Sequence, residues 1–296
     1  MLESYEQLLE ATIQHLEGLK SHGAKFVTVS RETLEGLRRP GEVVSPKSSA
    51  PPQTEQSRIP AQQPPARNLR TDLFVEKQSL PELKPALDPQ AKAAAFDDLR
   101  RRAMACVKCS HLAAARRNVV FGVGNINAQL MFVGEAPGAD EDAQGEPFVG
   151  KAGQLLTKII ETMGLTRDSV YIGNILKCRP DTPGQSAGNR KPTPEEMKTC
   201  IPFLHEQIDL IQPKVLVALG ATAVEGLLGR TIGITRLRGN WQTYRGIPLM
   251  PTYHPAYLLR NAALSEKRRV WEDMLQVMEK LGMPISEKQR NYFLKA

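Results

Sequence analysis

The sequence predicts an α/β fold built on a short parallel sheet with helices on both faces. Short apolar runs, typical of buried strands, alternate with longer helical patterns along the second part of the chain. The four predicted strands are Leu130–Val133, Val170–Ile175, Val215–Leu219 and Leu249–Thr252. Strands that are separated by helices form parallel sheets covered on both faces. In such sheets, ligands bind beyond the carboxyl ends of the strands.

Helical patterns flank and separate the four strands. Pro89–Met104 is rich in alanine and arginine, and Thr193 followed by Glu196 forms a capping-box pattern. The expected helices cover residues 89–104, 154–163, 193–211, 222–228 and 266–281, and a short helix is expected to open at Pro255.

Composition and charge narrow the class of protein. The 296 residues are 41% hydrophobic and 24% charged, as in ordinary soluble proteins. No run of eighteen apolar residues and no signal-peptide pattern occurs, so we expect a cytoplasmic, nucleoid-associated protein with no membrane contact. The net charge of +7 lies entirely in residues 96–296, which carry 27 basic and 20 acidic side chains. This excess modestly favours a polyanionic partner.

The chain divides into four predicted parts. Residues 1–39 show leucines at helical spacing and form a small helical appendage, with no motif that identifies a partner. Residues 40–87 are expected to be a disordered linker, because seven prolines fall between positions 40 and 65 among serines and glutamines. The main domain is expected at 88–285, followed by a tail at 286–296. We expect a monomer.

All four cysteines fall in the main domain, at Cys106, Cys109, Cys178 and Cys200. The first two form a Cys-x-x-Cys pair whose thiols can reach one metal centre. Four cysteines grouped in one domain of a cytoplasmic chain favour a metal site over disulfides. The spacing alone fits a zinc ion and a [4Fe–4S] cluster equally well, and unrelated buried cysteines remain the alternative.

Chemically informative groups follow three of the predicted strands. Phe148 offers a flat apolar face, Asn174 a donor and an acceptor on one amide, and His254 a hydrogen-bond donor or proton carrier. The backbone of 134–138 adds N–H groups that a ligand can approach. Together these groups suit a flat heterocycle with polar edges, such as a nucleobase. Basic residues expected to hold phosphates nearby are Lys177, Arg179, Arg190, Lys191 and Arg260.

Each of these side chains also has an ordinary structural interpretation. Phe148 would be a core residue, Asn174 a turn cap, and His254 a loop histidine with its hydrogen bonds satisfied. Only their joint placement at the ends of parallel strands favours a binding site.

Four motifs carry a resemblance to a known family. They are Gly-Glu-Ala-Pro-Gly-x-Asp-Glu-Asp from Gly134, Gly-x-Pro-Phe-Val-Gly-x-Ala-Gly from Gly145, Asn-x-x-Lys-Cys-Arg-Pro from Asn174, and His-Pro-Ala-Tyr-Leu-Leu-Arg from His254. With the four cysteines, they resemble the family 4 uracil-DNA glycosylases, the iron–sulfur members of their superfamily. The resemblance covers roughly residues 98–281.

The resemblance implies a three-layer fold, a [4Fe–4S] cluster on Cys106, Cys109, Cys178 and Cys200, and a substrate of single- or double-stranded uracil-containing DNA. The implied reaction flips uracil out of DNA and hydrolyses its N-glycosidic bond, which leaves an abasic site and starts base-excision repair. The alternatives are a non-catalytic iron–sulfur protein that binds DNA and senses redox state, and a zinc-stabilised nucleotide-binding module.

Roles for individual residues follow from the same resemblance. Phe148 would stack on uracil, Asn174 would read its polar edge, and Glu141 would lie near C5, where it would crowd a thymine methyl group. His254 would donate to O2, beside the backbone of the loop that begins at Gly134. The loop residues concerned are Gly134, Glu135 and Ala136.

Other branches of the superfamily carry an aspartate at the position of Ala136, so Glu135 is the candidate for positioning water. The DNA contacts are expected at Arg179, Arg190, Leu258 and Arg260, with Leu258 or Leu259 as the wedge that enters the gap left by the flipped base. Residues 181–188 resemble an insertion in the family pattern. They contain no histidine of the kind with which a related branch captures uracil-DNA covalently.

Overall fold

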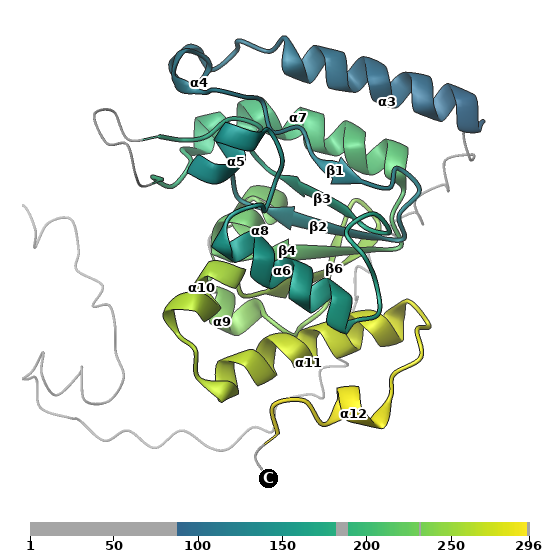
Figure 1. Cartoon of the computed structure of the whole chain (residues 1–296). Helices are drawn as coiled ribbons and strands as arrows, with labels where there is room; N and C mark the ends of the chain where they lie inside the picture. Colours follow the sequence, from purple (N-terminus) through teal and green to yellow (C-terminus); the bar gives the residue numbers. More distant parts are fainter. Residues whose placement is uncertain (1–87, 182–188, 231, 295–296) are drawn as a thin grey trace, which may run out of the picture. The chain divides into compact units, whose positions relative to one another are not determined.

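The computed structural model describes residues 88–181, 189–230 and 232–294 (Figure 1). The appendage and linker expected for residues 1–87 lie outside the described residues, as do residues 182–188 of the expected insertion. Within the described ranges, no helix is both long enough and apolar enough to cross a membrane.

A six-stranded sheet with the order β1-β3-β2-β4-β6-β5 forms the centre of the domain. Its inner strands pair in parallel and confirm the four strands predicted from sequence. The inner strands are β2 (Leu130–Gly134), β3 (Tyr171–Asn174), β4 (Val215–Leu219) and β6 (Ile247–Thr252). Two antiparallel edge strands, which the sequence did not predict, make the sheet mixed: β1 (Val123–Gly124) beside β3, and β5 (Gln242–Tyr244) beside β6.

Helices cover both faces of the sheet and give three layers. On one face, α7 (Pro194–Ile211) packs between the sheet and α3 (Pro89–Met104), and α8 (Ala221–Leu228) lies beside α7 (Figure 1). The other face is covered by α6 (Lys151–Thr162) and α11 (Leu264–Lys280) (Figure 1). These five helices confirm the predicted ones to within three residues at each end. The remaining short helices are α4 (Ser110–Ala115), α5 (Ala139–Gln144), α9 (Ile234–Leu237), α10 (Pro255–Arg260) and α12 (Glu287–Arg290).

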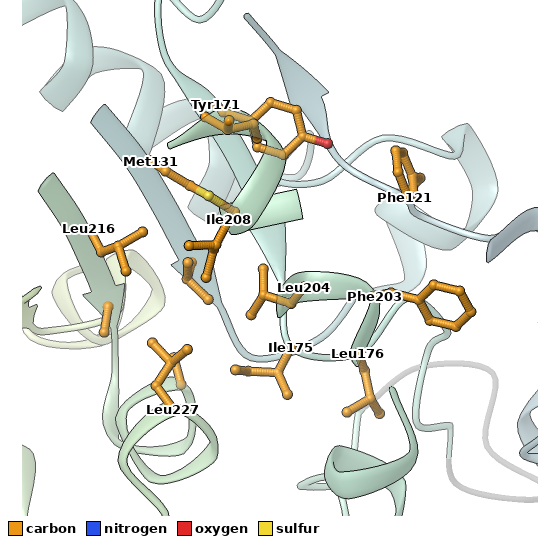
Figure 2. Close-up of a cluster of buried hydrophobic side chains, with 14 of the residues drawn as sticks. Phe121, Met131, Tyr171, Ile175, Leu176, Phe203, Leu204, Ile208, Leu216 and Leu227 are labelled. Carbon is orange, nitrogen blue, oxygen red and sulfur yellow. The ribbon is translucent and has the colours of Figure 1, made fainter. Parts of the chain in front are cut away.

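Alternate residues of β2 face opposite layers, because side chains alternate along a strand. Met131 packs in the cluster that contains α7, where Ile208 and Leu204 point toward the sheet (Figure 2). Its neighbour Phe132 packs in the other cluster, with α6 and α11. Every residue of β2 is buried, which explains why the strand reads as a continuous apolar run.

The tail that follows residue 285 packs against the domain. The indole N–H of Trp271 in α11 donates to the Gln289 carbonyl at 2.6 Å, and the Gln289 amide donates to the Thr162 carbonyl at 2.8 Å. These bonds join α12 to both helices of the α6–α11 face.

A hydrogen-bonded lysine lies in the core between β3 and α7. Lys177 is 2% exposed, and its ammonium donates to the Asn174 carbonyl at 2.9 Å and to Oε1 of Gln207 at 2.6 Å. The Gln207 amide nitrogen in turn donates to the Phe121 carbonyl and to the Tyr171 hydroxyl, both at 2.9 Å. Burial lowers the pKa of Lys177 to about 8. The prediction that Lys177 holds phosphate is therefore wrong, since its ammonium is enclosed by the protein.

Replacing Gln207 by leucine should destabilise the fold strongly. The substitution removes the side-chain acceptor of the buried Lys177 ammonium and leaves the Phe121 carbonyl without its donor. Loss of one partner of a buried charge typically costs about 3 kcal/mol or more. Urea unfolding followed by circular dichroism measures the loss. The exposed Gln154 of α6 supplies the control, since Gln154→Leu should change the free energy of unfolding by less than about 0.5 kcal/mol. Equal unfolding midpoints for the two variants would contradict this account.

Candidate functional site

The loops after β2, β3 and β6 meet at one end of the sheet. Gly134 ends β2 directly opposite Asn174 at the end of β3. A Cβ atom placed on Gly134 would collide with Oδ1 of Asn174 and lie 2.6 Å from Cζ of Phe148, so both side chains reach this glycine. The His254 ring follows β6, and its centroid lies 5.5 Å from that of Phe148, with 30° between the ring planes. The structure therefore brings together the three side chains that the sequence assigned to one pocket.

Asn174 presents an unsatisfied acceptor. Its side chain is 2% exposed, and Oδ1 is buried with no hydrogen-bond partner among the described residues. Leaving a buried acceptor unpaired costs about 1–3 kcal/mol. A ligand that brings an N–H group to this oxygen would remove that cost.

Glu141 holds the loop around the pocket. Its Oε2 accepts from the Gly138 amide at 3.0 Å, and its Oε1 accepts from the amides of Val149 and Gly150 at 2.9 and 3.0 Å. The carboxylate thus joins the start of α5 to the segment that carries Phe148. Its expected position near C5 of a base stays a prediction.

His254 is held as a neutral imidazole in one tautomer. It caps α10, where Nδ1 accepts from the Ala256 amide at 3.1 Å, so the ring proton is on Nε2. Burial lowers the pKa of His254 to about 4, helped by the charge of Arg260 and opposed by that of Glu141. At neutral pH the Nε2–H group is therefore a hydrogen-bond donor without a positive charge.

The loop 134–136 is tied to the segment after β3. The amides of Ile175 and Leu176 donate to the carbonyls of Gly134 and Glu135 at 3.0 and 3.1 Å. The side chain of Glu135 is partly buried, which raises the pKa of its carboxyl group, while a hydrogen bond with Thr222 opposes that rise. Ala136 is partly buried against the core. The catalytic roles expected of Glu135 and of the Ala136 backbone stay predictions.

The expected DNA contacts separate into different environments. Nε of Arg179 donates to the Asn189 side chain at 2.9 Å. Arg190 forms an ion pair with the buried carboxylate of Glu196, at 2.5 and 2.8 Å, and this lowers the pKa of Glu196 to about 2. Arg190 is thus engaged within the protein, and its contact with DNA stays a prediction. Arg260 is exposed in the last turn of α10.

The two leucines of α10 lie in different environments. Leu258 is 5% exposed and packs with Tyr253 and Val270, whereas Leu259 is 48% exposed. The assignment of Leu258 to a DNA contact is therefore wrong for this structure, because a core residue is not available to enter DNA. Leu259 is the exposed alternative.

The four cysteines converge as predicted. Cys106, Cys109, Cys178 and Cys200 are free thiols that line one small cavity together with Leu112, Arg116, Leu176 and Thr199. Two donors point at the sulfur atoms: the Arg116 guanidinium lies 3.1 Å from Sγ of Cys178, and the Lys177 amide lies 3.2 Å from Sγ of Cys200. Burial raises the pKa of the Cys200 thiol to about 11. Metal centres bind the thiolate form of cysteine, so these four side chains, which line one cavity, are the candidate ligands of a single centre.

The sequence analysis missed an ion pair that supports the end of β6. Asp273 of α11 is fully buried, and it pairs with the Arg238 guanidinium and accepts from the Thr252 hydroxyl at 2.6 Å. Thr252 precedes His254 by two residues. Burial raises the pKa of Asp273 to about 6. The signal available in the sequence was an aspartate on the apolar face of the last long helix.

Arg167 is a second site residue that the sequence analysis missed. It lies in the loop between α6 and β3, and its guanidinium donates to the carbonyls of Pro147 and Phe148. No motif or periodic pattern surrounds it, so no sequence signal pointed to it.

Comparisons with known proteins identify the superfamily to which the chain belongs. A model of the "Uracil DNA glycosylase superfamily" matches residues 121–275, just over half of the chain. A type-4 uracil-DNA glycosylase of Thermotoga maritima is 46% identical over 177 residues, which cover 58% of this chain and 88% of the relative. The type-4 enzyme of Archaeoglobus fulgidus is 42% identical, with 58% and 87% covered.

A type-5 uracil-DNA glycosylase of Pyrobaculum aerophilum is more distant, at 30% identity with 55% of this chain and 83% of the relative covered. The type-4 enzyme of the same organism is 42% identical, with 54% and 82% covered. Together with the superfamily match, these identities show that the chain belongs to the type-4 family of uracil-DNA glycosylases.

Proposed function

We propose that the chain is a DNA glycosylase that accepts a uracil flipped out of DNA and hydrolyses its N-glycosidic bond, leaving an abasic site. The observation that carries this proposal is the buried, unpartnered Oδ1 of Asn174 beside the rings of Phe148 and His254. An aromatic face, a planar amide and a neutral imidazole match the face and the polar edges of a single pyrimidine.

Asn174 distinguishes uracil from cytosine in this proposal. Uracil presents an N–H at position 3 and a carbonyl at position 4, and the Asn174 amide has an acceptor and a donor in matching order. Cytosine presents an acceptor at N3 and a donor at the exocyclic amine. Each mismatched buried group then stays unpaired, at a cost of about 1–3 kcal/mol.

His254 and the backbone near Glu135 stabilise the leaving group. As the glycosidic bond breaks, the sugar gains positive charge and the uracil ring gains negative charge, part of it on O2. The neutral imidazole donates its Nε2–H to that oxygen, and a single donor of this kind often contributes about 3 kcal/mol. Backbone N–H groups of Glu135 and Ala136 act on the same charge. The Glu135 carboxylate positions the attacking water.

The thiol site is proposed to hold a [4Fe–4S] cluster bound by the four cysteines. A zinc ion binds its sulfurs at about 2.3 Å, which brings four thiolates nearly into contact, whereas a four-iron cluster needs them further apart. Among the described residues, no group of three or more His, Cys, Asp or Glu side chains is arranged to hold one ion, although four thiols line one cavity. When bound, the cluster would link three segments through its cysteine ligands: residues 106–109, the loop that follows β3, and α7.

The exposed end of α10 is the proposed contact with DNA. Arg260 is exposed and offers a positive charge to phosphate, and the exposed Leu259 fills the gap left by the flipped nucleotide. Arg179, after Cys178, adds a second positive charge on the described surface.

Replacing Asn174 by alanine should lower kcat/KM on uracil-containing DNA roughly 100-fold, because two hydrogen bonds to the base are lost. Release of free uracil from single- and double-stranded oligonucleotides measures the effect. Asn127 is exposed and lies before the start of β2, whereas the pocket lies at the other end of that strand. Asn127→Ala is therefore the control and should keep wild-type activity. Wild-type activity in Asn174→Ala would remove this assignment.

The pH profile tests the neutral histidine. Since the pKa of His254 is lowered to about 4, the imidazole stays neutral as pH falls from 8 to about 5. We expect no loss of kcat from His254 across that range and a loss only as pH approaches about 4. His254→Ala should lower kcat roughly 100-fold at every pH in the range. A wild-type kcat that declines near pH 6.5, with that decline absent from His254→Ala, would show that the protonated group has an ordinary pKa.

Iron analysis tests the cluster. Protein purified without oxygen should be brown and contain four iron and four sulfide per chain, whereas Cys178→Ser should lose most of both. Thr199 lines the same cavity without a thiol, so Thr199→Ser is the control and should retain the iron. A colourless wild-type protein that contains one zinc ion would contradict the proposal.

A further inference from the structure

Phe148 adopts a backbone conformation that its side chain disfavours. Its φ angle is +55°, in the left-handed region that bulky residues rarely occupy. The residue is nevertheless 6% exposed and packs in the core cluster of the α6 face. Such strained conformations persist only where surrounding contacts hold them, and they gather at functional sites.

Arg167 supplies the contacts on the carbonyl side of this segment. Its Nη2 donates to the Pro147 carbonyl at 2.8 Å, and its Nη1 donates to the Phe148 carbonyl at 3.1 Å and to the Thr157 hydroxyl at 3.3 Å. The rigid fork of a guanidinium fixes two neighbouring carbonyls relative to each other, which a lysine cannot do. Arg167 thereby fixes the peptide plane on each side of the Phe148 Cα atom.

Two further contacts close the segment from other directions. The Glu141 carboxylate accepts hydrogen bonds from the amides of Val149 and Gly150. These N–H groups come just after the two carbonyls that Arg167 binds. Gly153 of α6 lies under Phe148, where an added Cβ would overlap the Phe148 backbone. The helix can approach the strained residue only because position 153 is glycine.

We propose that Arg167 is a positioning residue for uracil recognition, which holds the Pro147 and Phe148 carbonyls so that the Phe148 ring stays in place to stack on the base. The inference rests on the proposed function, since it assigns the Phe148 ring to the flipped uracil. Arg167 bonds to backbone and to Thr157, so it acts on recognition of the base through Phe148.

The test compares binding of two oligonucleotides, one with a non-hydrolysable 2′-fluorinated deoxyuridine and one with thymidine at the same position. The wild-type preference for the uracil strand should fall roughly 10-fold in Arg167→Ala, the size expected for a weakened base–aromatic stack. Arg167→Lys, which keeps the charge without the fork, should restore only part of it. In a Phe148→Ala background, Arg167→Ala should have no further effect, because coupled residues are not additive.

Arg268 supplies the matched control. It also donates to two backbone carbonyls, those of Arg290 at 2.7 Å and Tyr292 at 2.8 Å, but it does so at α12. Arg268→Ala should lower thermal stability and leave the preference for uracil unchanged. If Arg167→Ala fails to fold, as judged by circular dichroism, the preference for the uracil strand is compared between Arg167→Lys and Arg268→Lys instead. Only Arg167→Lys should then show a reduced preference.

The outcomes separate the two proposals. A wild-type protein that does not prefer the uracil strand contradicts the proposed function itself. A wild-type preference that Arg167→Ala and Arg167→Lys both retain overturns the role of Arg167 alone. The role is also overturned if Arg167→Ala costs the same factor with and without Phe148, since the two residues would then act independently.

Discussion

The parallel pairing of β2 with β3 is the interaction on which the pocket depends. Its register sets Gly134 opposite Asn174 at the last pair of the ladder, so the chain leaves both strands at the same edge. A shift by one residue would turn the Asn174 side chain to the other face of the sheet. The buried apolar residues of β2 and β3 fix the register, because each strand packs against both helical layers. Core packing and the position of Asn174 in the pocket are thus set by the same ladder.

The pocket holds polar groups in states that cost stability without a ligand. Asn174 keeps an unpaired acceptor, and Phe148 keeps a strained backbone. Hydrogen bonds behind the pocket hold each in place: Lys177 on the Asn174 carbonyl, and Arg167 on the Phe148 carbonyl. Hydrogen-bonded groups behind the pocket and an unpaired acceptor inside it preorganise the pocket for a polar ligand.

The sequence predicted the inner strands, the main helices and the convergence of Phe148, Asn174 and His254, because strand–helix alternation and parallel topology are set by local patterns. The edge strands, of two and three residues, could not be predicted from the sequence, because so short a run shows no hydrophobic periodicity. The choice between Leu258 and Leu259 depended on the rotation of a six-residue helix. Lys177 looked like a phosphate ligand because a second basic residue, Arg179, shares its motif, and only packing shows that α7 covers Lys177.

Contacts that join distant segments were the hardest to foresee. Arg167 reaches back nineteen residues to Phe148, and Gln207 reaches thirty residues to Lys177, with no repeated spacing to reveal either contact. The segment from Asn174 to Cys178 shows why such links matter. Within five residues it places a side-chain amide in the pocket, a carbonyl on the Lys177 ammonium, a backbone amide on Cys200 and a thiol in the cysteine cavity. The thiol site and the pocket therefore share one short stretch of backbone, so whatever fixes the four cysteines also fixes the direction in which the Asn174 side chain faces the pocket.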